Sequence, residues 1–456
     1  MTDSAGSTAV PSVERLEQGK SLRAVVPRAA HAGWQPEPER RNSLEILAES
    51  NQGRLPQLIP IRHGRMLQSP FTFFRGSAAL MAYDLSTTPT TGIRVQSCGD
   101  CHLLNFGLFA TPERHLVFDL NDFDETLPAP WEWDLKRLVT SIVIAARDVG
   151  HSEQKALDAA VACAISYRQR LREFSEMSPL DVWYYRLEHQ RLIEEAPDEE
   201  ARVRREEIRD KARSRLGEYL FPKITEPVGG SHRLVDEPPI LYHVNEPDAL
   251  ERITEGLEDY RLTLPEERRV LFDRYRLEDF AMKVVGIGSV GTRCIIGLFF
   301  SEDNHPLLLQ FKEARKSVLA PYAGASAYDN QGERVVHGQR LMQSASDIFL
   351  GWVRGRRGFD FYVRQLRDMK FTVPLDGMTS LQLSRYGEIC AWTLARAHAK
   401  GGDAAKISGY LGRGDNFPIA LGQFAVQYAD QNERDYAALQ QAERDGLIEV
   451  LREESK

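Results

Sequence analysis

Two neighbouring stretches of sequence decide the fold of this chain: CGDCHLLNFG at 98–107 and VFDLNDFDET at 117–126. The first contains Asp100 and Asn105, and the second begins with an apolar, strand-like run that delivers Asp122 at its end. Carboxylate and amide oxygens are the ligands that Mg²⁺ prefers in proteins. Two acid-rich loops joined by one short hairpin therefore predict a divalent metal site. Asn105 and Asp122 are the predicted ligands, which leaves Asp100 free to act as a base.

A glycine-rich segment, GIGSVG at 286–291, follows much later in the chain. A dinucleotide-binding fold would open a helix after this motif, but the next residues, TRCIIGLFF, have a strand pattern. A hairpin that folds over nucleotide phosphates fits better, because glycine lets backbone N–H groups approach the phosphates closely. A bulged hairpin without a ligand is the alternative. The predicted nucleotide contacts are Gly286, Gly288, Ser289 and Gly291.

The next predicted strand, LLLQFKEA at 307–314, carries Lys312. A strand lysine downstream of a glycine-rich hairpin can reach the phosphates of ATP. An acidic side chain on the following predicted helix, 331–346, would hold this lysine in place. Glu333 is the candidate, with Gln339 as the fallback.

Together these segments resemble the site of protein-kinase-like phosphotransferases, which combine a glycine-rich loop, a lysine, a base and metal ligands. The aminoglycoside and choline kinases are the most similar in style, because GDCHLLN resembles their GDxHxxN catalytic loop and NDFDE their metal-binding turn. The resemblance implies ATP and Mg²⁺ as cofactors. It implies supporting roles for His102 and Asp124, and it implies that Asp134, in PAPWEWDLKRL at 128–138, braces the catalytic loop.

The order of these parts departs from that of the kinases, in which the glycine-rich hairpin and the lysine precede the catalytic loop. Here they follow it. We therefore expect an α+β, two-lobed, protein-kinase-like fold in circularly permuted order. The helix ending LARAHA at 394–399 resembles the helix that leads into the catalytic loop. Asp403 follows this helix directly and is a rival base, but the residue five positions later is Ser408 rather than asparagine.

The chain from about 54 to 450 also resembles a bacterial family of unknown function numbered 2252. This resemblance rests on long motifs in one order: RMLQSPFTFFRG, GDCHLLNFG, FDLNDFDE, WEWDLKRL, GSVGTR, QFKEA, GQRLMQSASDIFLGW and LARAHA. It implies little about activity.

Composition shifts predict five parts. They are a mobile segment at 1–53 with one helix near 43–50, a helical lobe with the catalytic and metal-binding loops at 54–220, a Pro- and Gly-rich linker at 221–270, a β-rich nucleotide-binding lobe at 271–376, and C-terminal helices at 377–456 that complete the helical lobe.

Length, charge and apolar content limit the possible folds and functions. With 456 residues, the chain exceeds the roughly 250–300 residues that one core serves, so two lobes are expected. Its 66 acidic and 58 basic residues give a net charge of −8, which argues against binding nucleic acid through overall charge. No apolar run reaches the roughly 18 residues of a membrane span, and the first residues lack the pattern of a signal peptide. Five cysteines, an odd number, favour a cytoplasmic location over a disulfide framework.

The expected function is an ATP- and Mg²⁺-dependent phosphotransferase acting on a hydroxyl acceptor, expected to be a small molecule. A metal-dependent hydrolase without ATP is one alternative, and nucleotide-binding pseudokinases and nucleotidyl transferases are others. The hydrolase would use Asp100, His102, Asp119 and Asp122.

Two smaller groups of residues stay open. Cys98 and Cys101 form a CxxC that fits either small loop residues or a redox or zinc site. Arg62, Arg65 and Arg75 either bind an anionic substrate or pair with the acidic loops.

Overall fold

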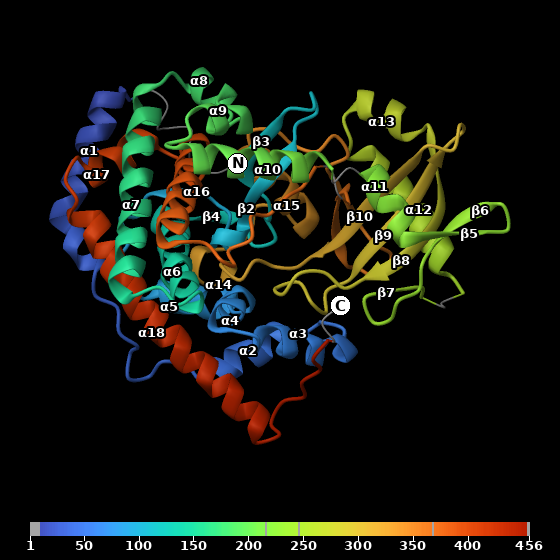
Figure 1. Cartoon of the computed structure of the whole chain (residues 1–456), viewed down its shortest axis with the longest axis horizontal. Helices are drawn as coiled ribbons and strands as arrows, with labels where there is room; N and C mark the ends of the chain where they lie inside the picture. The colour runs from blue at the N-terminus through green and yellow to red at the C-terminus, as the bar shows by residue number, and fades with distance from the viewer. Residues whose placement is uncertain (1–9, 215–216, 245–246, 367–368, 454–456) are drawn as a thin grey trace.

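The computed structural model describes residues 10–214, 217–244, 247–366 and 369–453. Helices and one large antiparallel sheet occupy separate regions, with most long helices on the left and the sheet on the right in Figure 1. This separation makes the chain an α+β protein, as expected. Within the described residues, none of the helices combines the length and apolar character that crossing a membrane demands.

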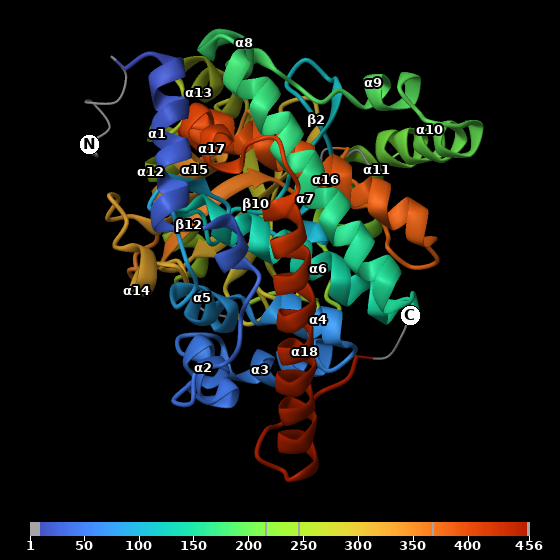
Figure 2. The same ribbon diagram turned by 90° about the vertical axis from the view of Figure 1, so that its left-hand side faces the viewer.

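The helical region is built around α6 (Trp131–Asp148), whose residues from Trp131 to Ala146 are all buried. A helix that is buried on every side lies in the middle of a core. The long helix α18 runs alongside it (Figure 2). The helices that surround α6 are α7 (Glu153–Glu176), α16 (Ser380–Gly401), α17 (Ala404–Leu411) and α18 (Asn416–Arg444).

The sheet has six antiparallel strands in the order β11-β12-β10-β9-β8-β7. Lys312 lies on the central strand and pairs with Cys294 on one side and Tyr362 on the other. The helix α15 (Gln331–Met342) connects β10 to β11 and packs on β11 and β12. The strands are β7 (Leu241–Tyr242), β8 (Tyr275–Lys283), β9 (Cys294–Ser301), β10 (Pro306–Ala314), β11 (Gly351–Arg354) and β12 (Asp360–Gln365).

The prediction that 221–270 is an irregular linker is wrong, because the segment contains helices and strands. Its residues form β7 and the helices α12 (Ala249–Leu262) and α13 (Glu266–Phe272), which pack through Tyr260 and Phe272 on one face of the sheet. The opposite face packs against a segment made of α11 (Gly217–Ile224), β5 (Thr225–Val228) and β6 (Ser231–Leu234). Gly229 and Gly230 form the turn between β5 and β6, whereas Pro222 and Pro227 lie inside α11 and β5.

The N-terminal segment is not a free tail where it is described, which corrects the expectation for 1–53; residues 1–9 lie outside the described residues. Helix α1 (Ser12–Val25) packs against α17 so closely that a Cβ on Gly409 would lie 2.0 Å from the carbonyl oxygen of Leu16. The expected helix near 43–50 is present as α2 (Ser43–Asn51). It is followed by α3 (Ile59–Met66), α4 (Pro70–Gly76) and α5 (Ala78–Ser86), which lie below the core in Figure 1.

Two short ladders position the acidic loops. β1 (Arg94–Ser97) pairs with β4 (Leu127–Pro130), and β2 (Phe106–Ala110) pairs with β3 (Leu116–Leu120). Residues 98–105 run from β1 to β2, and residues 121–126 run from β3 to β4. Both loops therefore start and end on paired strands, which holds them side by side.

The remaining elements are helices and short turns. Three helices follow α7: α8 (Pro179–Tyr184), α9 (His189–Glu194) and the charged α10 (Glu199–Arg213). Short turns complete the set: η1 (Arg28–His31), η2 (Pro56–Leu58), η3 (Leu103–Asn105) and α14 (Ala320–Ala323).

Candidate functional site

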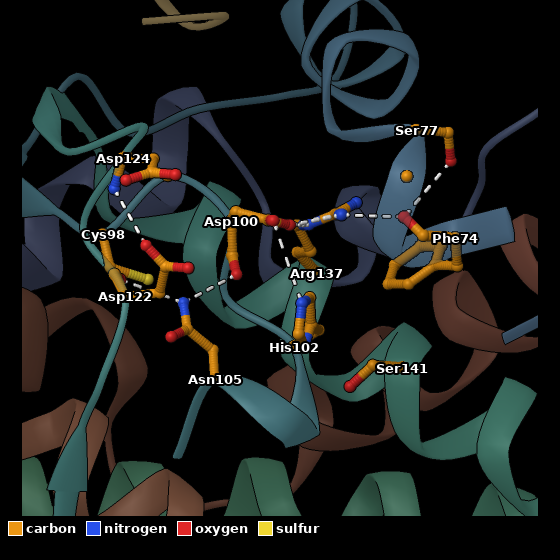
Figure 3. A network of polar contacts seen from close by, with 12 residues as sticks. Phe74, Ser77, Cys98, Asp100, His102, Asn105, Asp122, Asp124, Arg137 and Ser141 are labelled. Atoms are coloured by element: carbon orange, nitrogen blue, oxygen red, sulfur yellow. Dashed lines mark hydrogen bonds and ion pairs between the residues drawn. The ribbon is translucent and has the colours of Figure 1, made fainter. Parts of the chain in front are cut away.

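Asn105 joins the two acidic loops. Its Nδ2 donates hydrogen bonds to the carbonyl oxygens of Asp100 at 3.0 Å and Asp122 at 3.1 Å (Figure 3). Because the amide nitrogen is used twice, the amide oxygen points elsewhere. This buried Oδ1 has no hydrogen-bond partner among the described residues.

Asp134 lies beneath the first loop, in the first turn of α6. Its carboxylate accepts hydrogen bonds from the backbone N–H groups of Cys98 at 2.8 Å and Gly99 at 3.0 Å, and its Oδ2 lies 3.3 Å from Nε2 of His398. Burial alone would raise the pKa of Asp134, but the contact with His398 and these donors lowers it. Gly99 is required here, because its φ is +83° and a Cβ would lie 2.3 Å from the carbonyl oxygen of Glu125.

The carboxylate of Asp100 is held by Arg137, a residue that the sequence motifs did not indicate. Arg137 Nε donates to Asp100 Oδ1 at 2.6 Å. Arg137 follows Asp134 by three positions on α6, so both face the same loop. Nε2 of His102 lies 3.8 Å from Asp100 Oδ2, and burial lowers the pKa of His102 to about 4. His102 is therefore neutral near pH 7.

Lys312 is paired with the acids of the second loop. Its Nζ lies 2.5 Å from Asp124 Oδ2 and 3.6 Å from Asp122 Oδ2, and its side chain is 4% exposed. Burial opposes the charge of Lys312, but Asp122 and Asp124 raise its pKa well above the ordinary value. Burial likewise opposes the charge of Asp122, yet Lys312 holds the pKa of that carboxyl low.

Glu333 is not the partner of Lys312, which corrects the prediction. It lies 3.7 Å from His337 on its own helix, and the fallback Gln339 donates to Gln343. Asn330 caps α15 and places Glu333 in its half-exposed first turn. The next residue, Arg334, faces inward and donates to the carbonyl oxygens of Asp124 and Thr126.

Asp124 connects the second loop to the sheet. Its Oδ2 accepts a hydrogen bond from Ser289 Oγ at 3.0 Å, and its Oδ1 accepts one from the Tyr362 hydroxyl at 2.8 Å. The glycine-rich loop is thereby tied to the acidic turn through Ser289.

The segment before α3 also holds the glycine-rich loop. The N–H of Leu55 donates to the carbonyl oxygen of Gly291 at 2.8 Å, and Arg54 Nη1 donates to that of Val290 at 2.6 Å. Gly286 and Gly291 have φ values of +64° and +87°, which favour glycine.

A pocket of about 120 Å³ brings most of the predicted residues together. Lys312, Gly291, Asp134 and Glu333 do not line it. A larger cavity of about 340 Å³ lies elsewhere, between α12 and the sheet face formed by Phe280, Phe311 and Phe361, away from the acidic loops. The predicted residues that line the smaller pocket are Asp100, His102, Asn105, Asp122, Asp124, Gly286, Gly288 and Ser289.

Comparison with known protein families shows to which family the chain belongs. The family model described as "uncharacterized protein conserved in bacteria (DUF2252)" matches residues 54–442. The chain belongs to this family. Neither the curated proteins nor the solved structures contain a match. The DUF2252 match spans every residue that lines the smaller pocket except Ser50.

The DUF2252 site fits a divalent cation. Asn105 offers a buried amide oxygen with no partner among the described residues, and Asp122 offers a carboxylate in the same pocket. Hard oxygens of this kind suit Mg²⁺, which keeps several waters and needs few protein ligands.

The alternative hydrolase set is not assembled. Asp119 is fully buried and accepts hydrogen bonds from Arg396 at 2.6 Å and from the hydroxyl of Ser344 at 2.7 Å, and it does not line the pocket. The rival Asp403 caps α17, where it accepts a hydrogen bond from the N–H of Lys406 at 3.0 Å.

Cys98 and Cys101 have free, buried thiols whose sulfur atoms lie close to a carboxylate oxygen of Asp134. The Asp134 oxygens already accept the hydrogen bonds of the loop. Burial raises the pKa of Cys98 well above its ordinary value and that of Cys101 to about 12. The raised pKa values disfavour the thiolate form, which metal ligation requires.

Proposed function

We propose that this chain is an ATP- and Mg²⁺-dependent phosphotransferase with a kinase-like fold in circularly permuted order. The observation that carries the proposal is one pocket lined by Asn105, Asp100, Asp122 and the glycine-rich loop, in which the buried amide oxygen of Asn105 is left without a hydrogen-bond partner among the described residues. This arrangement provides a base, two oxygen ligands and a phosphate-binding loop within one small space.

The order of elements around the sheet supports the kinase-like interpretation. In protein kinases a glycine-rich loop covers the phosphates and the lysine lies on the third strand. Here the glycine-rich loop joins β8 to β9, Lys312 lies on β10, and α15 precedes β11 and β12.

The end of α16 supports the permutation. A Cβ on Gly402 would lie 2.4 Å from Val95, and one on Gly401 would lie 2.9 Å from Gln96. The helix that resembles the one leading into a catalytic loop therefore ends against β1, the strand that does lead into residues 98–105. The chain does not run from α16 into β1, but the two elements lie next to each other as the permuted order requires.

The chain's own residues have distinct roles in this proposal. Asp100, oriented by Arg137, accepts the proton of the acceptor hydroxyl. Asn105 and Asp122 hold Mg²⁺, which supplies positive charge to the phosphate oxygens when bound. Lys312 would contact a phosphate by exchanging its ion pairs with Asp124 at 2.5 Å and Asp122 at 3.6 Å for it.

Nucleotide binding requires the site to open. The pocket of about 120 Å³ is smaller than the roughly 300 Å³ at which small-molecule sites begin. The glycine-rich loop lines this pocket, and Arg54 and Leu55 hold it by their contacts with Val290 and Gly291.

A thermal-shift titration with ATP and Mg²⁺ tests the proposal. We expect a Mg²⁺-dependent rise in Tm, since ligand at a hundred times its Kd stabilises the native state by about 2.7 kcal/mol. Asp122→Asn should abolish the rise, and Glu333→Gln, which alters a residue outside the pocket, should keep it. No rise at millimolar ATP in the wild type overturns the proposal.

The products separate two transfer chemistries once nucleotide binding is established. Release of ADP indicates phosphoryl transfer, whereas release of pyrophosphate indicates nucleotidyl transfer on the same site.

A further inference from the structure

Three arginines, Arg54, Arg62 and Arg75, line the same pocket together with Asp100. We call these three side chains the arginine wall. Arg65 does not belong to this wall, because it pairs with Glu453 through two contacts of 2.6 and 2.8 Å.

Arg62 is buried without a counter-ion. Its side chain is 1% exposed and donates to the amide oxygen of Asn51 and the carbonyl oxygen of Gly76, each at 2.7 Å. Arg54 similarly donates to two carbonyl oxygens, those of Ser50 and Val290. Across the described ranges, neither guanidinium has a carboxylate within ion-pair distance. Burial and mutual repulsion lower the pKa of Arg62.

Arg75 is less satisfied still. In the part of the chain that the structure describes, its guanidinium makes neither a hydrogen bond nor an ion pair, and its Nε is buried. The backbone carbonyl oxygen of Arg75 lies 3.5 Å from where a Cβ of Gly288 would be, so the residue sits beside the glycine-rich loop. The charged groups that influence it most are Asp100 and Asp122.

Buried cations without a counter-ion are costly, so such a group is best explained by an anion that arrives from outside. Guanidinium groups suit phosphate and carboxylate, because they donate two parallel hydrogen bonds to one anion. The pocket is therefore lined by two sets of side chains of opposite charge. The acids suit a metal–nucleotide complex, and the arginine wall suits a second anion.

We propose that Arg54, Arg62 and Arg75 bind the phosphate or carboxylate group of the acceptor, and this inference rests on the proposed phosphotransferase function. The acceptor class is then a small hydroxyl compound with an acidic group, rather than the amine-bearing acceptors of aminoglycoside and choline kinases. In the reaction, the acceptor oxygen forms a bond to the γ-phosphorus and its proton goes to Asp100. The bond between that phosphorus and the bridging oxygen breaks, and ADP leaves with the electron pair.

The first experiment uses inorganic phosphate as the probe, measured by calorimetry on the full-length protein. We expect Arg75→Gln to weaken phosphate binding by about tenfold or more, which corresponds to one lost charge-assisted contact. Arg75→Lys should restore part of the affinity. Arg28→Gln is the matched control, because Arg28 donates only to the carbonyl oxygen of Leu411, at 2.8 Å, within the described residues. No phosphate binding in the wild type, or equal loss in both glutamine variants, overturns the inference.

The second experiment repeats the titration with saturating Mg²⁺ and a non-hydrolysable ATP analogue. Undiminished phosphate binding beside the analogue supports an acceptor subsite. Displacement of phosphate by the analogue overturns the inference, because the arginine wall would then bind the nucleotide's own phosphates. Failure of the analogue to bind counts against the phosphotransferase function instead, which separates the two failures.

Discussion

Arg137 donates from Nε to Oδ1 of Asp100 across 2.6 Å, and its Nη2 donates to the carbonyl oxygen of Phe74 across 2.9 Å. One buried guanidinium thus joins the proposed base to α4, the helix that carries Arg75. The position of the base and the position of the arginine wall therefore depend on the same side chain.

Replacing this side chain should destabilise the fold. Arg137→Met leaves the carboxylate of Asp100 and the carbonyl oxygen of Phe74 without their donor, and we expect the free energy of unfolding to fall by about 3 kcal/mol. Urea unfolding measures the change. In a double-mutant cycle with Asp100→Asn, the loss in the double variant should be clearly smaller than the sum of the single losses; additive losses would show that the pair is not coupled.

The lysine between the two acids leads to a prediction that depends on metal. Lys312→Met removes the cation that contacts both Asp122 and Asp124, and we expect a loss of about 2 kcal/mol because both acids are partly exposed. Mg²⁺ should restore more stability to this variant than to the wild type. Glu333→Gln should change stability by less than about 0.5 kcal/mol. An Mg²⁺ effect of the same size in Lys312→Met and wild type would contradict metal binding at these carboxylates.

His31 makes stability depend on pH. Its ring is 1% exposed and lies 2.8 Å from the Tyr410 hydroxyl, and burial lowers its pKa to about 3. The unfolded chain takes up a proton near pH 6.5, whereas the folded chain stays neutral, so stability falls as pH falls below about 6.5. Between pH 7 and pH 5 this group should cost about 2 kcal/mol.

The measurement is urea unfolding at both pH values in wild type and His31→Gln. The variant should lose about 2 kcal/mol less than the wild type over this interval, while its stability at pH 7 serves as the reference. Equal losses would mean that the His31 ring is protonated in the folded state.

The contact between α1 and α17 is tested by two glycines. A Cβ at position 409 would lie 2.0 Å from the carbonyl oxygen of Leu16, so Gly409→Ala should separate the helices and cost about 2–3 kcal/mol. Gly414→Ala is the control, because nothing lies within 4 Å of its Cβ position. Limited proteolysis should cleave α1 sooner in Gly409→Ala alone, and similar cleavage of both variants would contradict this packing.

Sequence periodicity located the long elements well. The strand expected at 307–314 is β10 (Pro306–Ala314), and the expected helix that ends LARAHA at 394–399 is α16 (Ser380–Gly401). The segment at 221–270 was predicted as a linker, because its prolines and glycines do not reveal that part of it pairs with a distant strand. Only the contact of β7 with β8 makes that segment part of the sheet.

The candidate site was predictable where short spacing determines geometry. Asp100, Asn105 and Asp122 lie on loops joined by one hairpin, so their proximity follows from local sequence. The prediction for Glu333 is wrong because consecutive side chains on a helix point about 100° apart, and the neighbouring Arg334 is the one that faces inward. Of the three arginines considered as anion-binding residues or partners of the acidic loops, Arg62 and Arg75 line the pocket, whereas Arg65 pairs with Glu453.

The attachment of Leu55 to Gly291 and of Leu451 to Pro60 has a consequence for the order of assembly. A chain is made and folds from its N-terminus, and here the first acidic loops emerge before the strands and helices that complete their surroundings. The arginine wall, supplied by residues near the start, is anchored by residues near the end. The pocket can therefore acquire its final shape only after the segment that contains Leu451 has been synthesised.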